Sequence, residues 1–146
     1  MNVVIDVPTG PEFAAALESS PDFAQPLFAA AMTNSTREVQ RVARSLAPHR
    51  TGTLQRSITA VTDYPMGQVF TLERYGIYME LGTKAHQILP KTKKALYWKG
   101  APYPVKVVNH PGTKPRPFMQ PAMVASQPYI QAQFEKVIQL VLERLT

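Results

Sequence analysis

The sequence of 146 residues contains no cysteine, and this absence excludes several kinds of chemistry at once. Without thiols the chain can form no disulfide, no thiolate metal site and no cysteine nucleophile. Long apolar runs are also missing, because no run approaches the roughly 18 residues that a membrane span needs. The stretch from Met1 to Pro11 contains no lysine or arginine, so it lacks the basic start of a signal peptide. We therefore expect a soluble intracellular protein.

Acidic residues are missing from the whole stretch between Leu81 and Phe134. This stretch holds eight of the 16 lysines and arginines of a chain whose net charge is +6. Because lysine and arginine displace counterions from phosphates, such a concentration favours contact with nucleic acid or another anionic surface. The chain also has 14 prolines, a high content that indicates ordered loop or extended chain. We therefore expect a projecting basic, proline-rich loop around residues 84–117, whose candidates for contact with a channel or partner are Lys91, Lys93, Lys94, Trp98 and Lys99.

Two helices are predicted in the first third of the chain. A short helix is expected from Pro8 to Ser19, where Pro11 suits a first turn and alanines follow. A longer helix is expected from Ser20 to Pro48, because its apolar residues recur at approximately helical spacing. This helix places three arginines on one polar face, which is either solvated or in contact with a partner or phosphate: Arg37, Arg41 and Arg44.

The end of the chain carries the clearest periodic signal. Its apolar residues fall on one face of a helix, namely Ile130, Phe134, Val137, Ile138, Val141, Leu142 and Leu145. Two starting points stay open. Pro121 suits a first turn, but that start leaves Pro128 inside the helix and kinks it, whereas a start near Ser126 does not.

The middle of the chain is predicted to form antiparallel strands. Residues Leu54–Thr62 and Gln68–Leu72 are expected to pair as a hairpin, because both are rich in β-branched or aromatic residues. Periodicity does not decide between a helical turn and a strand for Tyr75–Leu81. Further candidate strands are His86–Leu89, Leu96–Trp98 and Val105–Val108. The prediction is one α+β domain spanning residues 1–146, an antiparallel sheet with N-terminal helices and a long C-terminal helix packed on it.

The sequence offers few groups for catalysis or metal binding. His49, His86 and His110 each stand without a second histidine at ligand spacing, and no HExxH, GxSxG, P-loop or GxGxxG pattern occurs. We therefore expect no catalytic residue, no cofactor and no metal site. Glu80 is the last acid before the basic stretch. It either pairs with a basic residue or backbone amides, fixing a turn at Gly82 and Thr83, or acts as a general base with His86.

Three short motifs occur in a fixed order along the chain. The first is Ala47, Pro48, Thr51, Gly52, Leu54, Ser57 and Ile58; the second is Tyr75, Gly76, Tyr78, Glu80, Leu81, Gly82 and Thr83; the third is Arg116, Pro117, Phe118, Pro121, Ala122 and Met123. Together they resemble the signatures of the phage tail-completion family, the lambdoid group that includes minor tail protein Z. The resemblance covers about Val39 to Val141. Its departures are Gly76, where the family has alanine, and the proline-rich insert from Lys91 to Pro115.

The resemblance implies a non-enzymatic structural protein of the virion neck in a long-tailed bacteriophage. Such a subunit is assembled in the host cytoplasm and forms a homo-oligomeric ring, expected to be a hexamer, around the DNA channel. Its implied partners are the stopper of the head-side connector and the tail terminator or tube protein, with non-specific contact to channel DNA and none to a membrane. The implied subunit-interface or motif residues are Thr51, Gly52, Leu54, Tyr78, Glu80, Gly82, Thr83, Arg116, Pro117 and Phe118.

Three alternatives accompany this interpretation. The protein could be a tail terminator, because that class also consists of small α+β ring proteins. It could be a nucleic-acid-binding module that uses the three helix arginines and the lysine cluster, which the charge alone favours. A small hydrolase would depend only on Glu80 and His86. Trp98 fits both a ring protein and a nucleic-acid-binding module. One aromatic residue among lysines can fill an interface or stack on a base.

Overall fold

The computed structural model describes residues 2–5 and 22–145, so the helix predicted for Pro8–Ser19 lies outside the described residues. The chain divides into two compact units. The first unit comprises residues 1–76 and 117–146, and the second comprises residues 77–116. Helices and small antiparallel sheets build the described chain, which confirms the predicted α+β class.

The first unit is organised around helix α2, Gln25–Leu46. A proline in its first turn fits a position where no backbone N–H is needed for a helical hydrogen bond. The helix stops at Ala47, whose extended backbone (φ −63°, ψ 133°) suits the residue before Pro48. The predicted long helix is thereby confirmed. Its buried residues are Phe28, Ala31, Met32, Ser35, Thr36, Val39 and Ala43, a stripe with helical spacing.

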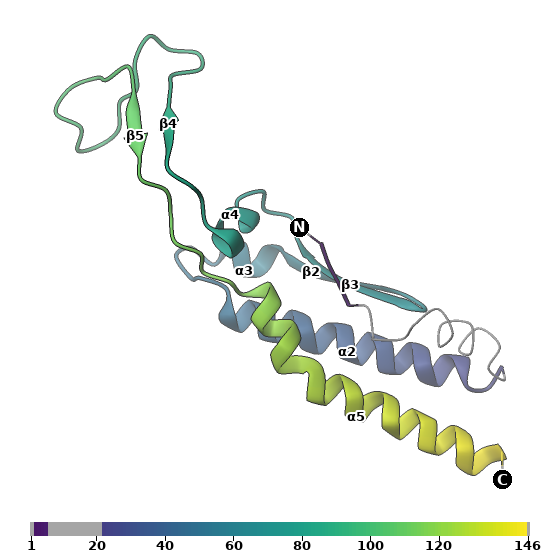
Figure 1. The fold of residues 1–146 in the computed structure, drawn as a ribbon. Helices are drawn as coiled ribbons and strands as arrows, with labels where there is room; N and C mark the ends of the chain where they lie inside the picture. Colours follow the sequence, from purple (N-terminus) through teal and green to yellow (C-terminus); the bar gives the residue numbers. More distant parts are fainter. Residues whose placement is uncertain (1, 6–21, 146) are drawn as a thin grey trace. The chain divides into compact units, whose positions relative to one another are not determined.

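The C-terminal helix α5 runs from Met119 to Leu145. Of the two predicted starting points, the earlier one, with Pro121 in the first turn, is therefore correct. Pro121 lies in the first turn, and Pro128 lies inside the helix. A proline at this position has no N–H to bond to the carbonyl of Val124, and Figure 1 shows a bend in α5. Phe118 and Met119 are 0% and 1% exposed, so burial of this first turn offsets the cost of the internal proline.

A three-stranded antiparallel sheet completes the first unit, with the strand order β1-β3-β2. Strands β2 (Ile58–Asp63) and β3 (Met66–Thr71) form the predicted hairpin, with Ile58 opposite Thr71. Strand β1 (Asn2–Ile5) pairs with the other edge of β3 and was not predicted. The strand predicted from Leu54 is wrong in its first half, because Thr53–Ser57 forms the short helix α3.

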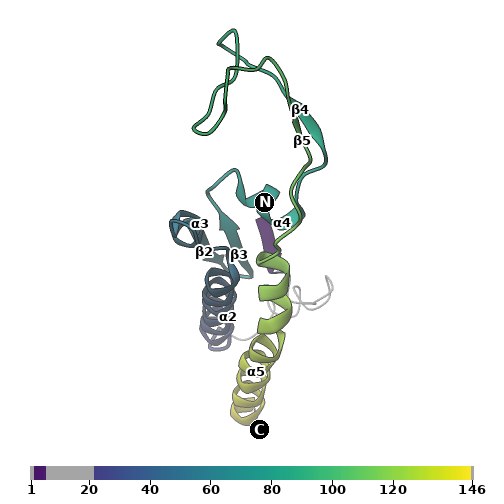
Figure 2. The same ribbon diagram turned by 90° about the vertical axis from the view of Figure 1, so that its left-hand side faces the viewer.

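Helix α2 packs against both α5 and the hairpin, as Figures 1 and 2 show. Toward α5, the ring of Phe28 stacks on that of Phe134 with centroids 6.4 Å apart. Toward the sheet, Met32 and Thr36 lie directly against Gly67 of β3, where there is no room for a larger residue. The C-terminal helix therefore packs on the N-terminal helix and sheet, as predicted.

The second unit is built from backbone pairing between two extended segments. It contains most of helix α4 (Gly76–Leu81), which shows that Tyr75–Leu81 ends in a helical turn and not a strand. Strands β4 (His86–Ile88) and β5 (Val108–His110) pair antiparallel and lie side by side in Figure 1. The predicted strands Leu96–Trp98 and Val105–Val108 do not form, apart from an isolated bridge between Leu96 and Val105 and the pairing of Val108 in β5.

The contact between α2 and β3 predicts a specific coupling between two positions. A Cβ atom added at Gly67 would lie well inside van der Waals contact of Thr36 Oγ1. We expect Gly67→Ala to lower the free energy of unfolding by about 1–3 kcal/mol through overpacking. Adding Thr36→Ala removes the obstructing hydroxyl, so the double variant should lose less stability than the sum of the two single variants. Urea denaturation of all four proteins measures this coupling, and strict additivity would contradict the contact.

Candidate interaction surface

The first motif shapes the backbone of the first unit. Gly52 has a left-handed conformation (φ 73°) that favours glycine, and it precedes the first residue of α3. The hydroxyls of Thr51 and Thr53 form a hydrogen bond of 2.9 Å, and Arg56 Nη2 donates to the carbonyl of Thr51 at 3.3 Å. Leu54 is buried with 4% of its surface exposed. Leu54 is thus a core residue, whereas Thr51 lies at the surface.

The second motif has a buried acid and an exposed apolar side. Glu80 is only 4% exposed, whereas Tyr78 and Leu81 are 58% and 64% exposed. Ile77, on the same short helix, is 39% exposed. Helix α4 therefore turns its carboxylate inward and presents large apolar side chains outward, an arrangement typical of a contact surface. We call Ile77, Tyr78 and Leu81 the α4 patch.

The structure joins the second motif to the start of the third. The backbone N–H of Arg116 donates to the carbonyl of Met79 at 2.7 Å. Thr83 and Thr113 exchange two backbone hydrogen bonds of 3.0 and 3.1 Å, and their hydroxyls lie 3.0 Å apart. Two short segments that are 30 residues apart in the sequence are thereby fastened together. The remainder of the third motif belongs to the first unit, where Phe118 is fully buried.

Thr113 is a site residue that the sequence reasoning missed, although a signal was present. The tripeptide Gly-Thr-Lys occurs twice, at Gly82–Lys84 and at Gly112–Lys114, and the two copies lie opposite each other. Both glycines have positive φ, 71° and 87°. A Cβ at Gly82 would come within 2.5 Å of the carbonyl oxygen of Thr113. The repeated tripeptide therefore allows a close backbone approach that other residues would block.

The basic loop predicted around residues 84–117 contains strands β4 and β5, and the segment of residues 89–107 that joins these strands is called here the β4–β5 loop. Lys91, Lys93, Lys94 and Lys99 are all exposed, and none forms an ion pair or hydrogen bond with a described residue. The loop closes on itself through two hydrogen bonds between Leu96 and Val105, of 2.7 and 3.0 Å. Its turn is fixed by the amide of Ala101, which donates to the carbonyl of Trp98 at 2.9 Å.

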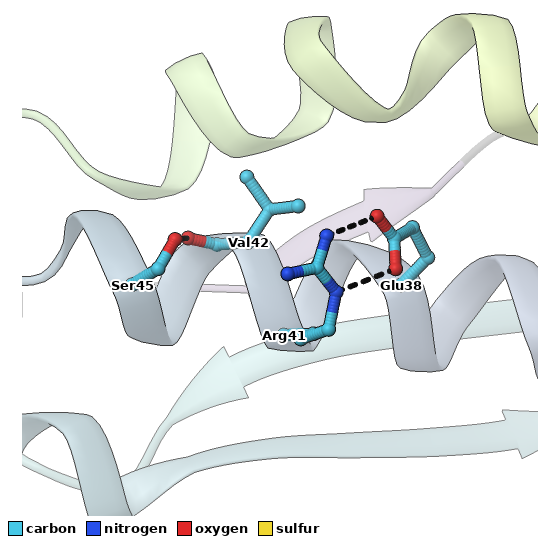
Figure 3. Close-up of polar contacts among 4 residues, drawn as sticks. All are labelled: Glu38, Arg41, Val42 and Ser45. Atoms are coloured by element: carbon cyan, nitrogen blue, oxygen red, sulfur yellow. Dashed lines mark hydrogen bonds and ion pairs between the residues drawn. The ribbon is translucent and has the colours of Figure 1, made fainter.

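The three arginines of α2 do not form a free cationic face. Arg41 donates two hydrogen bonds to the carboxylate of Glu38, of 2.6 and 2.8 Å (Figure 3). These bonds, with the positive charge of Arg41, hold the pKa of the Glu38 carboxyl below its usual value. Arg44 Nη2 donates to the carbonyl of Ile58 at 2.8 Å, on the outer edge of β2. Two of the three arginines are therefore engaged within the first unit.

The histidines of the second unit hold the strands together. His86 and His110 lie opposite each other in β4 and β5, with ring centroids 5.1 Å apart. Nδ1 of His110 accepts the amide hydrogen of Gly112 at 3.0 Å. Among residues 2–5 and 22–145, no group of three potential metal-ligating side chains occurs.

No family model, curated protein or solved structure matches this chain. Within the described residues, no helix is long and apolar enough to cross a membrane. Function is therefore inferred from two exposed features, the α4 patch and the lysines of the β4–β5 loop.

The paired Gly-Thr-Lys segments generate a prediction about the second unit. Gly82→Ala should weaken the Thr83–Thr113 pairing, because the new Cβ combines a left-handed conformation with a collision at the Thr113 carbonyl. Amide hydrogen exchange at Thr83 and Thr113 should become at least about tenfold faster, the equivalent of about 1.4 kcal/mol.

Gly100→Ala is the matched control, because Gly100 also has a positive φ (101°) but its Cβ would meet nothing within 4 Å. That substitution should leave exchange at Thr83 and Thr113 nearly unchanged. Equal effects of the two substitutions would show that close approach is not what the glycine at position 82 provides.

Proposed function

We propose that this chain is a non-enzymatic structural subunit of the neck of a long-tailed bacteriophage. In this role it is a tail-completion protein that forms a ring around the DNA channel and joins the tail to the head-side connector. The observation that carries the proposal is the α4 patch, three large apolar residues on six residues of helix. The three motifs that resemble the tail-completion family support the same role, and the patch falls within the second of them.

A ring needs a contact surface that differs from the surface it meets on the next subunit. Contacts of this heterologous type close into rings when the rotation between neighbours divides a full turn. The α4 patch is suited to one side of such a contact, since burying the exposed part of Tyr78 and Leu81 would stabilise an interface by about 1–2 kcal/mol each. The proposed ring is a hexamer in the virion neck, between the stopper and the tail terminator or tube protein.

A nucleic-acid-binding module is the second candidate, and a specific observation favours it. The β4–β5 loop carries five exposed lysines, Lys106 included, without ion-pair partners among the described residues. The arginines of α2 give this candidate less support, because Arg41 is paired with Glu38 and Arg44 is bonded to the Ile58 carbonyl. Binding of nucleic acid is also compatible with a ring around DNA, so the loop and the patch can belong to one protein.

The proposal predicts that a polar α4 patch abolishes self-association. Tyr78→Ser/Leu81→Ser should convert the ring into monomers in sedimentation velocity, while circular dichroism stays unchanged. A phage carrying this variant should accumulate full heads and unattached tails in negative-stain images. A phage that lacks the gene should show the same separated particles.

Tyr129→Ser/Leu140→Ser is the matched control, because it removes one tyrosine and one leucine from α5 that are also exposed, by 41% and 43%. This control should assemble and should yield joined particles. Normal joined particles from the phage that lacks the gene would reject the joining role. If the phage that lacks the gene gives separated heads and tails but the α4 variant still self-associates, the joining role stands. The α4 patch is then rejected as the subunit interface.

A further inference from the structure

The net positive charge of the chain comes from the second unit. Residues 77–116 contain eight lysines and arginines and one acid, which gives this unit a net charge of +7. The rest of the chain contains eight basic residues and nine acids, a net charge of −1. The single acid of the second unit, Glu80, is buried, so its exposed surface carries cations and no carboxylate.

The β4–β5 loop presents part of this charge together with aromatic side chains. Its five lysines, the four around Trp98 and Lys106, are exposed, and Tyr97, Trp98 and Tyr103 are 68%, 50% and 65% exposed. The Leu96–Val105 hydrogen bonds and the turn at Gly100 hold the aromatic residues on an ordered hairpin. Side chains on a preformed hairpin lose less conformational entropy on binding than side chains on a flexible tail.

We propose that the β4–β5 loop binds the phosphate backbone of nucleic acid without sequence specificity. Lys91, Lys93, Lys94 and Lys99 contact phosphates, and Trp98 offers a flat surface to sugars or unpaired bases. The inference deepens the proposed neck function and rests on it only for the identity of the nucleic acid, which would be the DNA of the channel.

The residue types favour nucleic acid over an acidic protein as the partner. Seven of the eight cations of the second unit are lysines and one is arginine. Lysine is depleted in protein interfaces, where arginine and its planar hydrogen-bonding geometry are enriched. A lysine ammonium acts as a compact point charge, which suits phosphates met at varying positions along a strand. The exposed aromatic residues among these lysines match surfaces that bind nucleic-acid strands without sequence preference.

Binding by the purified full-length protein tests the inference directly. The probes are a short duplex DNA of arbitrary sequence, one of its single strands, and polyglutamate as an anion without phosphate. Four lysine–phosphate contacts predict a slope of about −3.6 for the logarithm of duplex affinity against the logarithm of salt concentration, and about −2.8 for the single strand. Duplex affinity should therefore fall about 100-fold between about 50 and about 200 mM salt.

Two variants with equal change in charge locate the surface. Lys91→Gln/Lys93→Gln/Lys94→Gln/Lys99→Gln should lose the salt-dependent binding. Arg37→Gln/Arg50→Gln/Arg74→Gln/Lys136→Gln removes four exposed charges of the first unit and should retain the slope within about one unit. Circular dichroism of both variants verifies that they are folded. Trp98→Ala distinguishes the two forms of DNA: about tenfold weaker binding of the single strand alone indicates stacking on unpaired bases, and unchanged binding of both indicates phosphate contact.

Three results would overturn the inference. They are absence of DNA binding by the unaltered protein, an equal loss in both charge variants, and polyglutamate binding as tight as that of DNA. The last of these would assign the loop to an acidic protein partner. Each result can occur while the α4 patch variant still separates heads from tails, so failure of the DNA inference is distinguishable from failure of the neck function.

Discussion

Close packing of α2 against α5 is the contact on which the first unit depends. Ser35 lies seven residues from Phe28, on the same side of α2, and Ser126 lies eight residues before Phe134 on α5. Small residues at such positions let two helices approach closely, which brings the aromatic pair into contact. The hydroxyls of both serines are buried and have no hydrogen-bond partner among the described residues. An unsatisfied buried hydroxyl costs about 1–3 kcal/mol, so the packing around it must contribute more. Helix α2 packs against α5 on one side and against the sheet on its other side, where Thr36 lies against Gly67.

The second unit is stabilised in a different way, because it has almost no core. Of its residues, only Glu80 and Ala101 are buried. Backbone hydrogen bonds take the place of apolar burial: the Thr83–Thr113 pair, the β4–β5 ladder and the Leu96–Val105 bridge succeed one another along two extended segments. Their closest approach depends on the positive φ of Gly82 and Gly112. A two-stranded ribbon of this kind is marginally stable by itself. Its exposed side chains are available to contact other molecules.

Local signals in the sequence predicted most of the first unit and little of the second. Helical periodicity identified α2 and the main part of α5, and Gly52 has the left-handed conformation expected of a turn glycine. The start of α5 could not be decided, because burial of Phe118 and Met119, a tertiary effect, outweighs the unfavourable Pro128. Strand β1 was missed since its pairing with β3 spans more than 60 residues, and α3 was missed because five residues are too few to show helical periodicity. For the interaction surface, the sequence indicated the lysines and the glycine turns. It could not indicate that Glu80 is buried while Tyr78 is exposed, nor that Arg41 and Arg44 are engaged within the fold.

The near absence of a core in the second unit bears on how this unit meets a partner. The charged and aromatic side chains of residues 77–116 are mostly exposed. A segment with few buried contacts opens locally at low free-energy cost, and binding to a partner stabilises it by mass action. Under the proposed function, a neighbouring subunit would stabilise the α4 patch in this way and a phosphate backbone would stabilise the β4–β5 loop. Binding would then add to the stability that backbone pairing already gives the second unit.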